Sequence, residues 1–242
     1  MQLIDYFDRL YIVHLPERED RYRALQQELA QIGIDINAAK VQIPDAPRPP
    51  EANRFPSRGV YGNFLSHLGI LQESLQDGLK RVWVLEDDAI FRRRLRKTAE
   101  QEKLVQRLAQ DDWDMCYFGH SLTKELDGYE TGLVPFSGPF LWAHCYCVNA
   151  TVLAQLVQYL EETLHNPPGD PRGGKLYIDA AFTLFRQFHP EVRSLVSHPI
   201  LSAQKGSPSN LAAGHWYDRW TVTKPLVMAA RSIRDEIWRF GG

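Results

Sequence analysis

The fold of this chain is decided by one stretch, Val82-Trp83-Val84-Leu85-Glu86-Asp87-Asp88-Ala89-Ile90-Phe91, in which four apolar residues run directly into three carboxylates. An apolar run of this length is typical of a strand buried on both faces of a parallel sheet. The acids then lie at its carboxyl end, where open α/β sheets bind their ligands. Adjacent carboxylates repel one another, so the pattern favours a site where a divalent cation compensates their charge. The alternative is an acidic surface turn.

The segments before this stretch follow a strand–helix–strand pattern. Residues 10–15 predict a first buried strand, residues 25–32 carry apolar side chains at helical spacing, and residues 34–43 predict a second strand. Such an opening is typical of nucleotide-binding α/β sheets. Residues 44–56 contain five prolines and predict a surface excursion, and residues 59–76 predict a helix.

The segments after it continue the alternation. Strands are predicted at 114–119 and 139–149, and helices up to about 109 and at 151–164 and 177–188. The sequence therefore predicts an α/β domain over residues 1–205, with a nucleotide-binding sheet flanked by helices. Residues 206–242 predict a C-terminal helical extension that either packs on the core or lies at a membrane interface.

The bulk composition excludes several classes of protein. Of 242 residues, 44% are hydrophobic and 24% charged, which suits one globular domain. A net charge of -2 gives no overall field to attract nucleic acid. Neither a signal peptide nor an apolar run of about 20 residues is visible. Three cysteines are too few for a disulfide framework, so we expect a reducing, cytoplasmic setting.

The acidic strand end predicts a specific chemistry. Carboxylates there can hold Mn²⁺ or Mg²⁺ against a diphosphate, whose charge the metal neutralises when the diphosphate leaves. Alternate residues of a strand point the same way, so Glu86 and Asp88 are expected to be the metal ligands. Asp87 is expected to hold a neighbouring loop or a ribose hydroxyl.

A second motif precedes this strand, Gly59-Val60-Tyr61-Gly62-Asn63-Phe64-Leu65-Ser66-His67-Leu68. Together with residues 85–88, this motif resembles glycosyltransferase family 25, the lipopolysaccharide and collagen galactosyltransferase-like group. Residues 11–15, followed by Arg18 and Arg21, resemble the family's first strand and turn, and residues 199–204 resemble its Pro-x-x-x-x-Gln tail. Asn63 stands in place of the family's usual cysteine, and Asn210 in place of a later aspartate.

The resemblance implies a GT-A-like fold and an inverting, hexosyltransferase-type reaction. A sugar, most commonly galactose in the family, is transferred from a nucleotide-sugar, usually UDP-linked, to a hydroxyl of a glycan or lipid-linked acceptor. Asp179 is implied as the base that takes the acceptor's proton. The implied nucleotide-sugar-binding residues are Arg18, Arg21, Asn63, Ser66, His67 and Asp87.

Structural alternatives stay open for several of these residues. Arg21 also suits an exposed helix face, His67 a buried hydrogen-bonded position, and Asp179 a helix N-terminus. The basic run 92–97 is expected to be a solvated face, with an anionic acceptor or membrane surface as the alternative. Residues 224–240 form an amphipathic stripe that either docks on the core or makes peripheral contact with the inner membrane face.

Two other functions use the same residues. A nucleotidyl or phosphoryl transferase also needs metal-binding carboxylates, but no Gly-rich phosphate loop follows the first predicted strand. A non-catalytic family member would keep the fold as a nucleotide-sugar-binding module.

Overall fold

The computed structural model describes residues 1–110, 112–122, 126, 128–205 and 238–239. Within these residues, seven strands form the central sheet. In chain order they are β1 (Arg9–Val13), β2 (Val41–Gln42), β3 (Arg81–Glu86), β5 (Met115–Tyr117), β6 (Gly132–Pro135), β7 (Cys145–Asn149) and β8 (Ser194–His198). Their spatial order is β2-β1-β3-β7-β5-β8-β6. A separate two-stranded sheet pairs β4 (Ala89–Phe91) with β9 (Ser202–Gln204).

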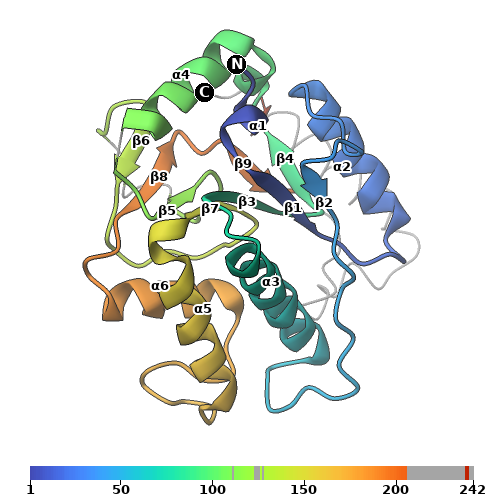
Figure 1. Cartoon of the computed structure of the whole chain (residues 1–242), viewed down its shortest axis with the longest axis vertical. Helices are drawn as coiled ribbons and strands as arrows, with labels where there is room; N and C mark the ends of the chain where they lie inside the picture. Colours follow the sequence, from blue (N-terminus) through green and yellow to red (C-terminus); the bar gives the residue numbers. More distant parts are fainter. Residues whose placement is uncertain (111, 123–125, 127, 206–237, 240–242) are drawn as a thin grey trace.

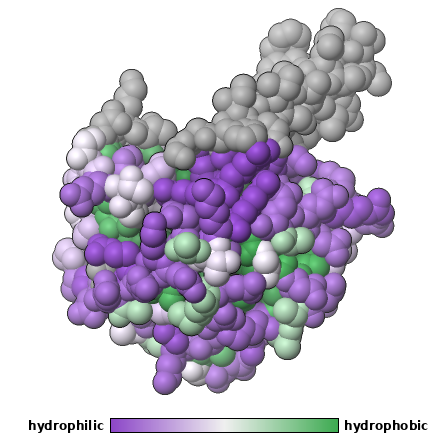
Figure 2. All heavy atoms as spheres, turned by 90° about the horizontal axis from the view of Figure 1, so that it is seen from above, coloured by the Kyte–Doolittle hydropathy of each residue, from purple (hydrophilic) through white to green (hydrophobic). Residues whose placement is uncertain are grey.

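Helices cover both faces of the central sheet (Figure 1). One face carries α3 (Arg58–Gln76), α5 (Ala150–His165) and α6 (Ile178–Phe188), and the other carries α1 (Leu3–Tyr6), α2 (Glu19–Gln31) and α4 (Thr98–Gln110). A short 3₁₀ turn, η1 (Arg93–Arg96), leads into α4. The surface on the side of the molecule that carries α4 is mostly hydrophilic, with apolar areas between the hydrophilic ones (Figure 2). Such a surface is expected where amphipathic helices cover a core.

The strand predicted from the opening stretch is confirmed. Val82 and Val84 belong to the core under α3, α5 and α6, whereas Trp83 and Leu85 belong to the core under α1, α2 and α4. All four side chains are completely buried. The alternation of β3 therefore joins the two cores and fixes where its acidic end emerges.

The sheet is mixed, whereas the sequence predicted a parallel one. β3 is parallel to β1 but antiparallel to β7, and β6 is antiparallel to β8. Parallel neighbouring strands need a crossover connection, which is usually a helix. Residues 118–144 connect β5 to its neighbour β7, and their described part contains no helix. Strand β7 therefore lies between β3 and β5 and runs antiparallel to both.

The predicted helices are confirmed, but two predicted strands are wrong in extent. Only Val41–Gln42 of the predicted strand 34–43 pairs with β1, because residues 36–40 form turns. Ile34 and Ile36 are buried against the α2 side without joining the sheet. β7 begins at Cys145 rather than near residue 139. Apolarity alone does not separate a buried loop from a strand.

The predicted C-terminal extension lies outside the described residues, as does Asn210, except for Trp238 and Arg239. The Arg92 guanidinium lies 4.2 Å from the ring centroid of Trp238, and Arg239 forms an ion pair with the buried Glu28. Arg94 donates to the Pro199 carbonyl. The first half of the basic run is thus packed against protein, and its predicted solvation holds only for the exposed Arg96 and Lys97. In the part of the chain that the structure describes, no helix is both long and apolar enough to cross a bilayer.

Candidate active site

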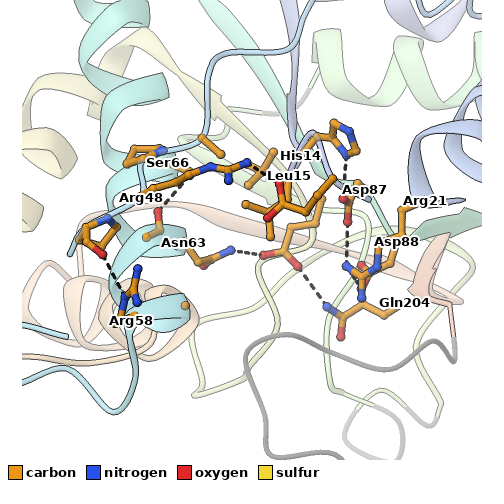
Figure 3. Close-up of a pocket in the computed structure, with 18 residues that line it drawn as sticks. His14, Leu15, Arg21, Arg48, Arg58, Asn63, Ser66, Asp87, Asp88 and Gln204 are labelled. Carbon is orange, nitrogen blue, oxygen red and sulfur yellow. Dashed lines mark hydrogen bonds and ion pairs between the residues drawn. The ribbon is translucent and has the colours of Figure 1, made fainter. Parts of the chain in front are cut away.

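The carboxyl ends of β1 and β3 open into a cavity of about 370 Å³. The start of α3 forms a second wall, and residues 46–49 form a third (Figure 3). The proline-rich segment, predicted as a surface excursion, therefore encloses the site. The lining consists of Val13, His14, Leu15, Glu17, Arg21, Ala46, Pro47, Arg48, Pro49, Arg58, Gly59, Gly62, Asn63, Ser66, Glu86, Asp87, Asp88 and Gln204.

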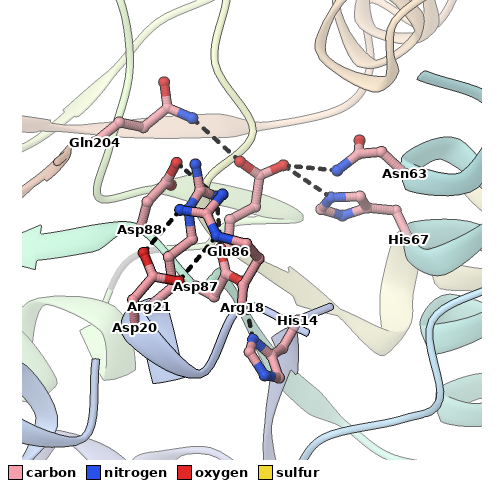
Figure 4. Close-up of polar contacts among 10 residues, drawn as sticks. All are labelled: His14, Arg18, Asp20, Arg21, Asn63, His67, Glu86, Asp87, Asp88 and Gln204. Carbon is pink, nitrogen blue, oxygen red and sulfur yellow. Dashed lines mark hydrogen bonds and ion pairs between the residues drawn. The ribbon is translucent and has the colours of Figure 1, made fainter. Parts of the chain in front are cut away.

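Glu86 is held on both carboxylate oxygens. Its Oε1 accepts from Nδ2 of Asn63 at 3.0 Å and lies 3.4 Å from Nε2 of His67, and its Oε2 accepts from Nε2 of Gln204 at 3.1 Å (Figure 4). Burial opposes ionisation, but His67 and Asn63 outweigh it and lower the pKa of Glu86 to about 2. Glu86 is therefore an ionised carboxylate, held in one position at the carboxyl end of β3.

Both carboxylate oxygens of Asp87 contact side chains of the protein. One oxygen lies 2.9 Å from Nδ1 of His14, the other accepts from Nη1 of Arg21 at 2.8 Å, and the residue is only 6% exposed. These bonds join the turn after β3 to the end of β1 and to α2. Asp87 therefore holds neighbouring segments together, and its contact with a ribose hydroxyl stays a prediction.

Asp88 has the least complete set of partners. Its Oδ2 lies 3.2 Å from Arg21, while its buried Oδ1 has no hydrogen-bond partner among the described residues. Burial and then the charge of Glu86 raise the pKa of Asp88 to about 7, against the opposing effect of Arg21. An orphaned oxygen in an electronegative pocket is the feature that a cation would satisfy.

Four of the predicted nucleotide-sugar residues line the cavity: Arg21, Asn63, Ser66 and Asp87. The Ser66 hydroxyl donates to the Gly62 carbonyl within α3 at 3.0 Å. Arg18 lies beside the acids (Figure 4) but outside the lining, where it binds Asp20 at 2.9 Å. Its pKa is raised first by Asp20 and also by the nearby charges of Asp87 and Asp88.

His67 lies behind the cavity rather than in it. Its side chain is completely buried, with Nδ1 2.9 Å from the hydroxyl of Tyr146 and Nε2 facing Glu86. This is the alternative anticipated from the sequence, a buried histidine that joins a helix to the sheet. His67 therefore acts on the site through Glu86.

Asp179 also lies outside this cavity. It stands in the first turn of α6, where its Oδ2 accepts from the backbone N–H of Trp142 at 3.1 Å and its Oδ1 from that of Ala180 at 2.8 Å. Trp142 is two residues before His144, whose carbonyl accepts from the N–H of Glu86 at 2.8 Å. A short stretch of backbone thus connects Asp179 to the acidic strand end.

Sequence reasoning missed the two arginines opposite the acids. Arg48 pairs with Glu17, and Nε of Arg58 donates to the Pro49 carbonyl at 3.1 Å (Figure 3). A signal was present, because Arg48 lies within the loop that follows β2, at the ligand-binding edge of the sheet. The cavity therefore has the acidic strand end with its partner Arg21 on one side, and Arg48 and Arg58 on the other.

The residues present fit a metal shared with a ligand. Among the described residues, no three His, Cys, Asp or Glu side chains converge as a complete metal site. Mg²⁺ is commonly held by one or two carboxylates together with substrate phosphates. Asp88, with its unpartnered oxygen, and Glu86 beside it fit that mode.

Comparison with known proteins gives the family. The model of glycosyltransferase family 25 (LPS biosynthesis protein) matches residues 7–166, about two thirds of the chain. The chain therefore belongs to glycosyltransferase family 25.

Curated relatives match a shorter part. Human procollagen galactosyltransferase 2 is 28% identical over 131 residues, which cover 47% of this chain and 21% of the relative. Human inactive glycosyltransferase 25 family member 3 is 29% identical over 136 residues, which cover 47% and 22%. The matched region thus spans about a fifth of the length of these relatives.

A solved structure confirms the fold. The glycosyltransferase involved in glycosylation of the major capsid of PBCV-1 aligns over 94% of this chain and 98% of its own, with a TM-score of 0.51 and 10% sequence identity. The expected α/β, GT-A-like class is therefore confirmed.

Proposed function

We propose that this protein transfers a hexose from a nucleotide-sugar, UDP-linked, to a hydroxyl of a glycan or lipid-linked acceptor, with inversion and with Mn²⁺ or Mg²⁺. The observation that carries the proposal is the cavity at the ends of β1 and β3, where Glu86, Asp87 and Asp88 lie across from Arg48 and Arg58. The negative charge of a nucleoside diphosphate suits both sides of the cavity, because a metal cation held by the carboxylates and the guanidinium groups of the arginines each bind phosphate oxygens.

The donor is assigned to this cavity. Arg48 and Arg58 are placed to bind the diphosphate directly, and Asn63 and Ser66 offer neutral polar groups beside it. Glu86 and Asp88 would hold the metal, which when bound offsets the charge of the departing diphosphate. Asp87, His14 and Arg21 would keep the acids in position through their ion pairs.

The transfer step needs one base. In the proposed reaction, Asp179 takes the proton of the acceptor hydroxyl while that oxygen forms a bond to the anomeric carbon. The bond from the anomeric carbon to the phosphate oxygen breaks, and its electron pair leaves with the nucleoside diphosphate. The two backbone N–H groups that bind Asp179 keep its carboxylate oriented.

A non-catalytic, nucleotide-sugar-binding role is the second candidate. It is favoured by one observation: a relative named inactive matches this chain as well as a galactosyltransferase does. The intact acidic strand end favours the enzyme. A nucleotidyl or phosphoryl transferase has no comparable support, and the cytoplasmic location and peripheral membrane contact stay predictions.

Donor binding and turnover separate these functions. The melting temperature is measured with UDP-galactose, UDP-glucose and GDP-mannose, each with and without MnCl₂, and release of nucleoside diphosphate is followed in the same samples. The proposal expects stabilisation by one UDP-sugar that depends on Mn²⁺, with slow hydrolysis, and loss of both in Asp88→Asn. Stabilisation without any hydrolysis or transfer would identify the binding module, and no stabilisation by any nucleotide-sugar would overturn both.

A further inference from the structure

Three exposed apolar residues lie next to Asp179 or to its backbone partner Trp142 along the chain. Leu141, Trp142 and Tyr177 are 49%, 40% and 45% exposed, and they account for three of the seven large exposed hydrophobic side chains in the described residues. Trp142 is bonded to Asp179 through its backbone, and Tyr177 precedes the first turn of α6. Grouped aromatic exposure of this kind marks a contact surface more often than scattered exposure does.

The outward position of Trp142 is imposed by its loop. The backbone N–H of Leu141 donates to the Ser121 hydroxyl at 2.9 Å, and Arg186 donates to the Gly138 carbonyl at 3.1 Å. Phe140 is buried between these anchors, whereas Leu141 and Trp142 after it are exposed. Trp142 itself has a φ of 77°, a conformation that is unfavourable for a bulky residue. A strained, firmly anchored and exposed aromatic residue is a reasonable sign of a ligand contact.

This group lies next to the donor cavity but not in it. None of its members lines that cavity. The carbonyl of His144 accepts a hydrogen bond from the N–H of Glu86. Trp142 is two residues before His144, so the Cα atoms of Trp142 and His144 are at most about 7 Å apart. A molecule resting on Trp142 would therefore be close to both the acidic strand end and Asp179.

We propose that Trp142 and Tyr177 form an acceptor platform, which holds a pyranose ring of the acceptor with one hydroxyl directed at Asp179. The inference deepens the proposed function and rests on it. The C–H face of a pyranose packs on an aromatic ring and removes apolar area from water. The sugar's hydroxyls at the ring edge then remain free to donate to a carboxylate. A lipid tail would gain nothing from Asp179, so the occupant is a sugar.

Ligand-observed NMR on the full chain tests the platform. Saturation-transfer spectra are recorded with the methyl glycosides of galactose, glucose and N-acetylglucosamine at millimolar concentration, without donor. At least one glycoside is expected to receive saturation at its ring C–H protons. Trp142→Gly and Tyr177→Ala are expected to reduce that signal at least five-fold. Phe188→Ala is the matched control, because Phe188 is 48% exposed at the other end of α6.

The Trp142→Gly variant also separates binding from folding. Glycine adopts a positive φ without strain, so the melting temperature is expected to stay the same or rise while glycoside binding is lost. The platform is overturned if no glycoside binds the wild-type chain, or if both variants bind like wild type. The Mn²⁺-dependent response to UDP-sugars, measured on the same samples, reports the donor site independently, so failure of the proposed function shows there instead.

Discussion

The side-chain amide of Gln204 donates to Oε2 of Glu86 at 3.1 Å, and so joins β9 to the acidic end of β3 across 118 residues. The backbone on both sides supports this bond, because Ala89 pairs with Gln204 and the N–H of Lys205 donates to the Asp88 carbonyl at 2.7 Å. The acidic turn is thus enclosed by a segment that lies beyond the matched region of the family model.

Gln204→Ala is expected to weaken Mn²⁺-dependent UDP binding by about 10- to 150-fold, because a hydrogen bond to a charged group contributes about 1.5–3 kcal/mol. The pairing of β4 with β9 uses backbone groups, so the fold should persist. Isothermal titration measures the affinity. Gln72→Ala is the control, since Gln72 makes the same kind of bond to Glu161 at 2.7 Å on the exposed surface. Equal affinities in both variants would show that the Gln204 bond does not organise the site.

The neighbouring acids should respond oppositely to neutralisation. Asp87→Asn leaves the charge of Arg21 poorly compensated in a buried setting, so a loss of about 3 kcal/mol of unfolding free energy is expected. Asp88→Asn removes a buried repulsion with Glu86, so without metal the melting temperature should rise. Thermal unfolding with and without Mn²⁺ measures both. An Asp88→Asn chain that is less stable without metal, or still stabilised by Mn²⁺, would contradict the proposed metal role.

The acidic strand end could be predicted because its signal is local. Four apolar residues must be buried on both faces, and the charges must then emerge at the edge of the sheet. The separate roles of the acids could not be predicted fully, since alternation says nothing about partners 19 to 118 residues away. Asn63 and His67 reach Glu86 from a helix, whereas Gln204 reaches it from a distant strand.

The wall of the cavity was misjudged for a related reason. Proline content correctly predicts a loop over residues 44–56, but not which way the loop folds. Its path depends on α3, where a Cβ on Gly62 would come within 3.0 Å of the Pro47 carbonyl oxygen. Such a contact joins segments that the sequence pattern treats independently. Strands β6, β8 and β9 were missed because none of them contains a longer apolar run, so that pairing with neighbouring strands and not the local pattern stabilises them.

Stability should depend on pH in opposite directions in two variants. Burial lowers the pKa of His144 to about 4, so between about pH 4 and 6.5 the unfolded state binds more protons and stability falls as the pH falls. The raised pKa of Asp88, about 7, has the reverse effect, because there the folded state binds more protons and stability falls as the pH rises. In the wild-type chain the two contributions nearly cancel.

Urea unfolding of the metal-free protein between pH 4.5 and 6.5 separates the two contributions. Asp88→Asn should gain stability with rising pH, and His144→Leu should lose it, each by up to about 1.4 kcal/mol per pH unit relative to the wild-type curve. Parallel curves for the two variants would contradict both pKa shifts. Other titrating groups change all three curves alike, so the comparison between variants is the decisive measurement.

Two glycines of α3 provide the sharpest test of the proline-rich wall. A methyl group at Gly62 meets the Pro47 carbonyl oxygen at 3.0 Å, so the loop must shift by a few tenths of an ångström, whereas a methyl group at Gly69 meets nothing within 4 Å. Both substitutions gain helix propensity of about 0.5–1 kcal/mol. Gly69→Ala is therefore expected to raise the melting temperature and leave UDP affinity unchanged. Gly62→Ala is expected to weaken UDP binding at least ten-fold, because Arg48 moves with the loop. If both variants bind UDP like wild type, residues 46–49 are not part of the donor site.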